Sequence, residues 1–497
     1  MRYKNLLSAI LGGFLAVCAY STSYGKATAF KPNVIKNAKQ SVVCIESRAA
    51  VSAYSPPGEW YGNGVVIDKQ LGYILTSGMN IGPCMVADYT VGFFNGVEAP
   101  AKLLYYDTWA DFALLQVDPS LLPKEIQAVK FSSKNPLLGQ SVFTVAKAKD
   151  KPAVLYTGSI DDLNYSMPWT MPQHFIRVGM PSKSGATGSL IFNAAGEGIA
   201  LNCAGSATMD VGLPLSYIAH VLPFLKQKKH PVRKHIGALL TTYSLDDAVR
   251  YDHLDPVSQK AYITKFKDAK NKVLQVDSIL KGTPAAGKLL PGDLIWALDG
   301  QFVGPNLVDF DRALDKSKDQ LCLTIFRQGA FHDVAIAPYD LNSHRITKMV
   351  QFGGATFFET DDFFSTLTGL APKTLVACIA ESNTIFKVPA WPRERFSLLG
   401  MECLAINGKP VQTLDALIAL IPQLVHEKYF TVAYINHLPM EHGVFYSFSY
   451  NRYKVDVEYD ANLAPPKVWA WDPIHLEWKG QDIVLTGIDQ LQPKNGH

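Results

Sequence analysis

One stretch, residues 175–199, constrains the fold more than any other part of the chain. It reads FIRVGMPSKSGATGSLIFNAAGEGI, in which short apolar runs alternate with polar, glycine-rich segments. β-Branched and aromatic residues bounded by Gly, Ser and Asn favour short strands joined by tight turns. The pattern therefore predicts a strand, a glycine-rich turn, a second strand, a hairpin and a third strand.

Two earlier stretches have the same character. Residues 61–68 (YGNGVVID) predict a glycine turn that leads into a strand, and GYILT at 72–76 predicts the next strand across a Lys69-Gln70 turn. The run DTWADFALL at 107–115 places two aspartates before an apolar strand. Further predicted strands lie at 39–48, 84–94, 99–105, 141–146, 154–160 and 175–178, and a helix is predicted at 217–229.

Together these stretches resemble the trypsin-like serine proteases of the HtrA/Deg family. The family's nucleophile segment, Gly-Asn-Ser-Gly-Gly-Pro-Leu, aligns without a gap with GATGSLI and places Thr187 at the nucleophile position. The intact GYILT places Met79 at the position of the general-base histidine, and DTWADFALL places Asp111 at the aspartate that orients this histidine. The resemblance implies a chymotrypsin-like double β-barrel at residues 30–228, to which the closely spaced strands and the final helix are well suited.

The triad-equivalent positions Met79, Asp111 and Thr187 are not expected to be functional in catalysis. In the family, histidine takes the proton of the attacking serine and aspartate holds the histidine. Methionine has no titratable group, and a hydroxyl without a base is a weak nucleophile. A one-residue shift in the alignment would put Asn80 at the base position, which is no base either. Backbone N–H groups of the oxyanion loop, at Gly185 and Ala186, are expected to bind a carbonyl or carboxylate without cleavage.

Three other side chains are candidates for a replacement base. His174 lies at the start of a predicted strand and His220 in the predicted helix, and the family uses neither position. Lys183 is closer to Thr187, and a Thr–Lys dyad is chemically feasible if burial lowers the pKa of the lysine, although this turn is expected to be exposed. An endopeptidase with a threonine nucleophile is therefore kept as an alternative.

Residues 235–342 resemble a PDZ domain of the HtrA type. The resemblance rests on GTPAAG at 282–287, PGDLI at 291–295 and an Asp-Gly turn at 299–300, followed by a helix at 307–316 and a strand at 321–327. It implies a turn whose backbone N–H groups hold a peptide C-terminus beside a strand edge. The residues of this turn would be Ile236, Gly237, Ala238 and Leu239. A PDZ-shaped packing module with a closed groove is the alternative.

The rest of the sequence predicts a further C-terminal unit, a linker, a tail and an N-terminal targeting segment. Residues 350–480 resemble a second, more divergent PDZ-like unit with a helix at 415–425, and Trp469 and Trp471 are expected to pack it. Charged residues 229–234 are expected to form a solvated linker, and 481–497 a tail. Arg2 and Lys4 before an apolar run predict a signal peptide at 1–25, with an uncleaved anchor or a lipoprotein as alternatives.

A signal peptide implies a periplasmic or secreted protein. Six cysteines would remain after cleavage, and their even number permits disulfides, although most lie in apolar runs that favour buried thiols. They are Cys44, Cys84, Cys203, Cys322, Cys378 and Cys403. The formal net charge of +3 does not indicate a nucleic-acid partner, and no His or Cys spacing indicates a metal, so no cofactor is expected.

The sequence thus predicts a mainly β protein, a chymotrypsin-like double β-barrel followed by two PDZ-like α/β domains. The favoured function is that of a pseudoprotease that binds unfolded segments or peptide C-termini, or that holds a partner. The alternatives are an active threonine-type endopeptidase and a non-catalytic structural partner of an active HtrA protease. The resemblance also implies a homo-oligomer such as a trimer, with no membrane contact beyond the signal peptide.

Overall fold

The structure is a computed structural model of the whole chain. It describes residues 30–53, 58–81, 85–166, 173–180, 182, 185–206, 208–267, 270–379, 401–427, 429–438, 447–456 and 465–485. The predicted signal peptide, Cys84 and Lys183 lie outside the described residues. Within the described ranges, no helix has the length and apolarity needed to cross a bilayer.

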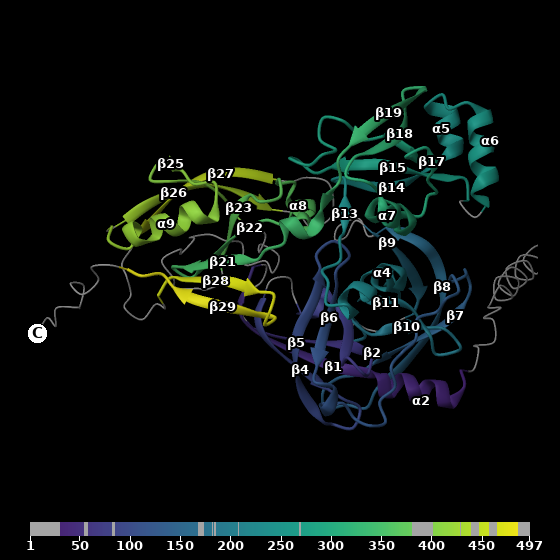
Figure 1. Cartoon of the computed structure of the whole chain (residues 1–497), viewed down its shortest axis with the longest axis horizontal. Helices are drawn as coiled ribbons and strands as arrows, with labels where there is room; N and C mark the ends of the chain where they lie inside the picture. Colours follow the sequence, from purple (N-terminus) through teal and green to yellow (C-terminus); the bar gives the residue numbers. More distant parts are fainter. Residues whose placement is uncertain are drawn as a thin grey trace, which may run out of the picture.

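Two closed six-stranded barrels form the first half of the chain (Figure 1). The first has the strand order β1-β2-β3-β6-β5-β4 and the second β10-β11-β12-β9-β8-β7. The first contains β1 (Val42–Ser52), β2 (Gly58–Asp68), β3 (Tyr73–Ser77), β4 (Met85–Gly92), β5 (Glu98–Asp107) and β6 (Phe112–Val117). The second contains β7 (Ser141–Ala146), β8 (Val154–Ser166), β9 (His174–Gly179), β10 (Leu190–Phe192), β11 (Gly198–Gly205) and β12 (Asp210–Pro214). The predicted chymotrypsin-like double barrel is confirmed.

Four short elements surround these barrels: α2 (Pro32–Ser41), α3 (Gly78–Ile81), η2 (Pro119–Leu121) and α4 (Leu215–Lys226). A single apolar core runs between the barrels, because Leu75 and Phe112 of the first share one cluster of buried side chains with Phe143 and Phe192 of the second. The rings of Phe143 and Phe192 stack with centroids 5.1 Å apart. Burial of this shared core fixes how the barrels meet, and the candidate site lies at their junction.

The third part of the chain is a sheet with the order β14-β15-β16-β18-β19, beside a short β13-β20 pair. Its strands are β13 (Lys234–His235), β14 (Ala238–Ser244), β15 (Lys272–Ile279), β16 (Leu294–Leu298), β17 (Gln301–Phe302), β18 (Leu321–Arg327), β19 (Ala330–Ile336) and β20 (Tyr339–Asp340). Its helices are α5 (Leu245–Tyr251), α6 (Pro256–Lys265), α7 (Leu307–Lys316) and η4 (Leu341–His344). The predicted helix at 307–316 and strand at 321–327 are confirmed, whereas α5 and α6 were not predicted.

The last part is one larger sheet with the order β27-β26-β24-β23-β22-β21-β28-β29. Its strands are β21 (Lys348–Phe352), β22 (Ala355–Glu359), β23 (Leu375–Ile379), β24 (Met401–Ile406), β25 (Lys409–Pro410), β26 (Tyr429–Leu438), β27 (Ser447–Asp456), β28 (Lys467–Asp472) and β29 (Glu477–Asp482). Its helices are α8 (Asp362–Thr368) and α9 (Leu414–Leu424). Both later β-rich units fit PDZ-like folds.

Three local expectations were wrong. Residues 39–41 end a helix instead of starting a strand, because Pro32 is suited to the first turn of a helix and the chain becomes extended only at Val42. The linker is not solvated throughout, since the side chain of Arg233 is buried against Asp107. Trp471 packs beside the core of the first barrel, and Trp469 donates to Gln351 and packs on a cluster that contains Val51 as well as residues of its own sheet.

The described cysteines 44, 203, 322 and 403 are free thiols, and the first, second and fourth of them are buried. Burial raises the pKa of the Cys403 thiol to about 12, so this sulfur stays protonated at neutral pH. The side chain of Cys378 lies outside the described residues. Buried thiols of this kind act as small apolar groups in a core.

Candidate active site

Thr187 lies in a tight turn before β10, where the backbones of the two barrels meet. Its carbonyl oxygen accepts two hydrogen bonds, from the backbone N–H of Asn63 at 2.9 Å and from the side-chain amide of Asn80 at 2.9 Å. Gly188 follows with φ of 87°, and a Cβ there would lie 2.0 Å from the carbonyl oxygen of Asn63. Only glycine fits this position, so the turn is held tightly against the first barrel.

The side chain of Asn63 holds the same turn from the other side. Its amide donates to the carbonyl of Gly185 at 2.9 Å, and its oxygen accepts from the backbone N–H of Lys147 at 2.7 Å. Asn63 therefore connects β2 to both the nucleophile turn and the end of β7. Glycines 62 and 64, which were expected to form a turn before the strand, lie within β2 on either side of Asn63.

Asn80 is a second buried asparagine at this junction, and no local sequence pattern indicates a role for it. Its amide also donates to the carbonyl of Asn63 at 3.1 Å and to the hydroxyl of Thr76 at 3.0 Å. A Cβ at Gly62 would lie 2.1 Å from the Asn80 side chain, so the glycine makes room for it. Asn63 and Asn80 thus join β2, α3 and the nucleophile turn into one polar cluster.

Asp111 lies next to this cluster in the loop between β5 and β6. One carboxylate oxygen accepts from the Tyr106 hydroxyl at 3.2 Å and the other from the Ser77 hydroxyl at 3.3 Å. Burial raises the pKa of the Asp111 carboxyl to about 7, although hydrogen bonds from Tyr106, Ser77 and the backbone N–H of Met79 oppose the rise. The carboxyl group is therefore held by neighbouring hydroxyl groups in place of a histidine.

Met79 lies in α3, beside Asp111 in the hydrogen-bonded network. The backbone N–H of Met79 donates to the hydroxyl of Ser77 at 3.3 Å, and that of Gly78 donates to the carbonyl of Asp111 at 2.9 Å. A Cβ at Gly78 would lie 2.3 Å from the Asp111 carboxylate, which explains the glycine. The Met79 side chain is 59% exposed. Its thioether has no proton to exchange, so it supplies no acid or base.

Some backbone N–H groups of the loop that would form the oxyanion hole already donate to carbonyl groups of the same loop. The N–H of Gly185 points to the carbonyl of Ser182 at 3.4 Å, and the N–H of Ser189 donates to the carbonyl of Ala186 at 2.9 Å. Ala186 is fully buried. An oxyanion hole needs free N–H groups directed at the substrate oxygen, and the Gly185 donor is directed at the carbonyl of Ser182 instead.

Neither candidate histidine is hydrogen-bonded to Thr187. Both ring nitrogens of His174 lack hydrogen-bond partners in the described part of the chain, and burial lowers the pKa of His174 to about 4. His220 lies 3.0 Å from Asp315, at the contact with the PDZ-like unit. Within the described ranges, the Thr187 hydroxyl has no hydrogen-bond partner at all.

The turn expected to hold a peptide C-terminus is packed between the barrels and the third sheet. Ile236 and Ala238 are buried, and the N–H of Gly237 donates to a ring nitrogen of His235 at 2.9 Å. Leu239 packs on a small apolar cluster that includes Trp109 of the barrel. One of the donors expected for a peptide carboxylate is thus already used, while β14 lies at the end of the strand order of its sheet.

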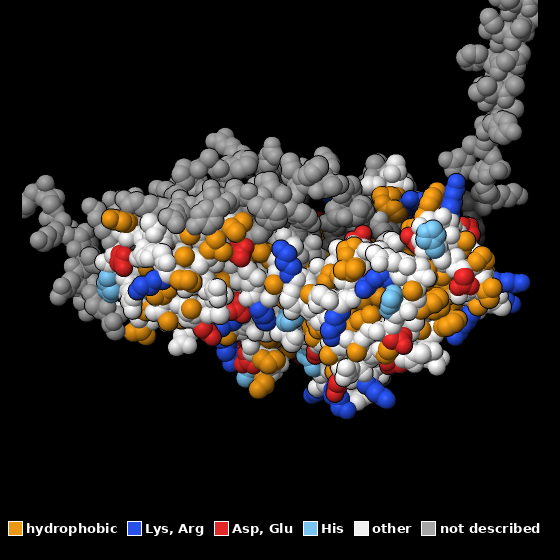
Figure 2. Space-filling model, turned by 90° about the horizontal axis from the view of Figure 1, so that it is seen from above, with side chains coloured by type: hydrophobic (Ala, Val, Ile, Leu, Met, Phe, Trp, Pro, Cys, Tyr) orange, Lys and Arg blue, Asp and Glu red, His pale blue; other side chains and the backbone are white. Residues whose placement is uncertain are grey.

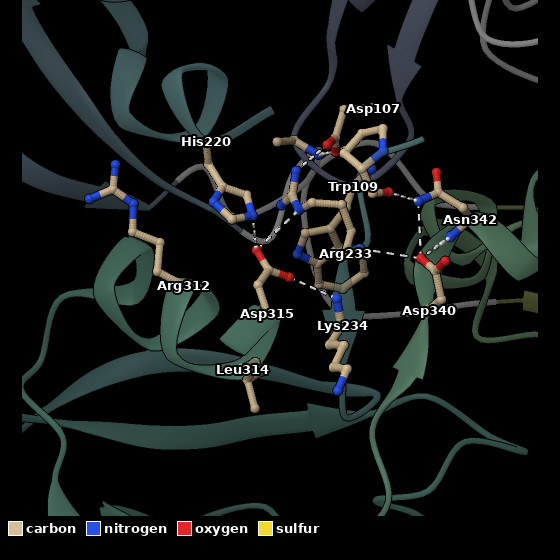
Figure 3. A network of polar contacts seen from close by, with 12 residues as sticks. Asp107, Trp109, His220, Arg233, Lys234, Arg312, Leu314, Asp315, Asp340 and Asn342 are labelled. Carbon is tan, nitrogen blue, oxygen red and sulfur yellow. Dashed lines mark hydrogen bonds and ion pairs between the residues drawn. The ribbon is translucent and has the colours of Figure 1, made fainter. Parts of the chain in front are cut away.

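The loop that holds Asp111 makes the contact with this turn. The ring centroids of Trp109 and His235 are 4.1 Å apart. Figure 3 shows the polar network beside them, in which buried Arg233 pairs with Asp107 and lies 3.7 Å from Asp315. Buried opposite charges therefore fix the PDZ-like unit to the barrels.

Residues 62–201 match the model of the trypsin-like peptidase domain. The uncharacterized protein RP187 of Rickettsia prowazekii is 30% identical over 189 residues, which are 37% of this chain and 97% of that protein. The pro-apoptotic serine protease NMA111 of Vanderwaltozyma polyspora is 26% identical over 437 residues, which are 85% of this chain.

The chain belongs to the HtrA/Deg family of trypsin-like serine proteases. It spans less than half of the fungal protease, since the match covers 43% of that protein. The HtrA-type protease AlgW, solved with a tripeptide, matches 62% of this chain and 95% of its own with 17% identity and a TM-score of 0.47. Within this family, the chain has methionine and threonine where the resemblance places histidine and serine.

Proposed function

We propose that this HtrA-family protein is a pseudoprotease that binds polypeptide without cleaving it. The observation that carries the proposal is the hydrogen bonding of Asp111. Its carboxyl oxygens accept from Ser77 and Tyr106, and the residue at the histidine position is Met79, which cannot accept a proton from Thr187. Loss of one triad member lowers the rate of such enzymes by several powers of ten.

The binding role is proposed for unfolded segments or peptide C-termini. It rests on the position of β14 at the end of its sheet, where an extended peptide can add as a further strand beside the turn at 236–239. Because the Gly237 N–H already donates to His235, a peptide carboxylate would have to replace that bond. The signal-like N-terminus supports a periplasmic or secreted location. Holding a partner protein there is part of the same proposal.

The first test compares cleavage of casein by the purified protein and by its Thr187→Ala variant at several pH values, with trypsin as a positive control. Neither protein is expected to cleave. Cleavage by the wild type that is lost in the variant would contradict the proposal and would direct attention to Lys183 as a base.

The second test measures binding of fluorescent peptides with a free or an amidated C-terminus. Gly237 has φ of 85°, and a Cβ there would lie 2.0 Å from Thr283, so Gly237→Ala is expected to distort the turn and weaken binding. Gly287→Ala is the matched control, because Gly287 has φ of 75° with nothing within 4 Å of its Cβ position. Equal binding of both peptide forms would exclude recognition of the carboxylate.

A further inference from the structure

A pocket on the two barrels is lined by none of the triad positions and by no residue of the PDZ-like turn. It has a volume of about 480 Å³ and lies between α2, the loop after β4 and the loop between β7 and β8. Figure 1 shows α2 along the lower edge of the two barrels. This volume falls within the range of small-molecule sites in proteins.

The lining combines one sign of charge with an apolar wall. Its charged residues are Lys36, Lys39, Lys147 and Lys151, and no aspartate or glutamate lines it. Its apolar part includes Ile35 and Phe94, together with two prolines and an alanine. By comparison, the face in Figure 2 mixes basic and acidic side chains.

Lys147 is the residue that makes this pocket unusual. It is only 7% exposed, and its ammonium group has no hydrogen-bond or ion-pair partner among the described residues. The nearby acids are already engaged, because Lys149 pairs with Glu46 at 2.7 Å and with Glu98 at 3.2 Å. An ammonium group that lines a pocket and has no protein partner attracts an anion that enters the pocket.

The neighbouring backbone argues against a peptide as the ligand. β4 is paired with β1 and β5, and β7 is paired with β8 and β10, so neither strand beside the pocket has a free edge. The N–H and C=O groups of an extended peptide would therefore lose water without gaining sheet partners. A ligand with one anionic group and a hydrocarbon chain avoids this cost.

We propose that this pocket binds an anionic amphiphile, with its carboxylate or phosphate at Lys147 and its acyl chain against Ile35 and Phe94. The lysines near the mouth, Lys36 and Lys151, would add attraction for the same head group. Such a ligand has two sources, a free fatty acid and an anionic membrane lipid, which share this chemistry.

The test is titration calorimetry of the purified protein with dodecanoate and with dodecyl phosphate below micelle formation. Lys147→Met is expected to weaken binding about tenfold or more, as expected for loss of a charged hydrogen bond. Because a buried substitution can perturb folding, the exposed pair Lys36→Glu/Lys151→Glu provides a second variant with the same expected direction. Lys130→Glu, an exposed lysine of the same barrels outside the pocket, is the matched control and is expected to bind normally.

Further measurements distinguish a membrane lipid from a free fatty acid as the ligand. Sedimentation with phosphatidylglycerol vesicles that is lost in the double variant would assign the ligand to the bilayer, and binding of dodecanoate without vesicle binding would assign it to a free fatty acid. Four results would each overturn the proposal. They are equal binding of a neutral sugar-headed amphiphile, equal binding of inorganic phosphate alone, displacement of dodecanoate by an acidic peptide, and no binding at all.

Discussion

The side-chain amide of Asn80 donates a hydrogen bond to the carbonyl of Thr187 at 2.9 Å and links residues 107 positions apart in the sequence. This bond joins the helix that contains Met79 to the turn at the nucleophile position. Asn80 is buried, so its three acceptors have no ready access to water when the amide is absent. The two halves of the candidate site are therefore held together by an amide and not by a catalytic histidine.

Asn80→Ala is expected to destabilise the protein by about 1–3 kcal/mol, because buried carbonyls would lose a donor. Urea unfolding and hydrogen exchange at the amides of Asn63 and Gly188 measure the effect. Asn33→Ala, an exposed position on α2, is the control and should change stability by no more than about 0.5 kcal/mol. If the two variants behave alike, the amide bridge does not hold the barrels together.

Met79→His combined with Thr187→Ser is expected to create peptide cleavage that neither single variant shows. A histidine at residue 79 would lie beside Asp111, and a positioned base contributes about 10²- to 10⁴-fold to rate. Casein and a fluorogenic peptide report the activity, and adding Asp111→Asn to the double variant should abolish the gain. A folded double variant without activity would indicate that the contact between the Gly185 N–H and the Ser182 carbonyl also prevents catalysis.

Asp111→Asn is expected to stabilise the protein at pH 8, on the order of 2 kcal/mol. Burial raises the pKa of Asp111 to about 7, above its ordinary value of 3.8, so the native state binds the proton more tightly than the unfolded state. The wild type therefore carries a cost above pH 7 that declines as the pH falls from 7 towards 4, and the advantage of the variant should decline with it. Thermal unfolding from pH 4 to 8 tests this, with exposed Asp150→Asn as a control. A gain independent of pH would refute the assignment.

Arg233→Met is expected to cost about 3–5 kcal/mol, because it leaves Asp107 buried without its positive partner. The PDZ-like unit should then separate more readily from the barrels, which limited proteolysis of residues 226–240 would detect. Arg233→Lys keeps the charge and should restore part of the loss. Exposed Arg250→Met serves as the control, and equal protease resistance in all variants would argue against the network as the fixing contact.

Local pattern was enough to predict much of the fold and three positions of the site. GYILT forms β3 as expected, and the residues that follow it bring Met79 next to Asp111. Helix α7 and strand β18 have the predicted bounds because their apolar periodicity and turn residues agree with their final packing. Asn80, by contrast, could not be assigned a role, since all its partners except Thr76 are distant in sequence and nothing local requires an amide there.

The sequence by itself determined the barrel architecture, the later β-rich units and the residue types at the triad positions. Each of these depends on short-range periodicity, turn chemistry or identity at an aligned position. Only the tertiary structure decided that Arg233 is buried, that Trp109 covers the turn at Ile236–Leu239 and that Lys147 lies without a partner in a pocket. These facts depend on which distant surfaces exclude water from a charge or a ring, and local pattern carries no information about that.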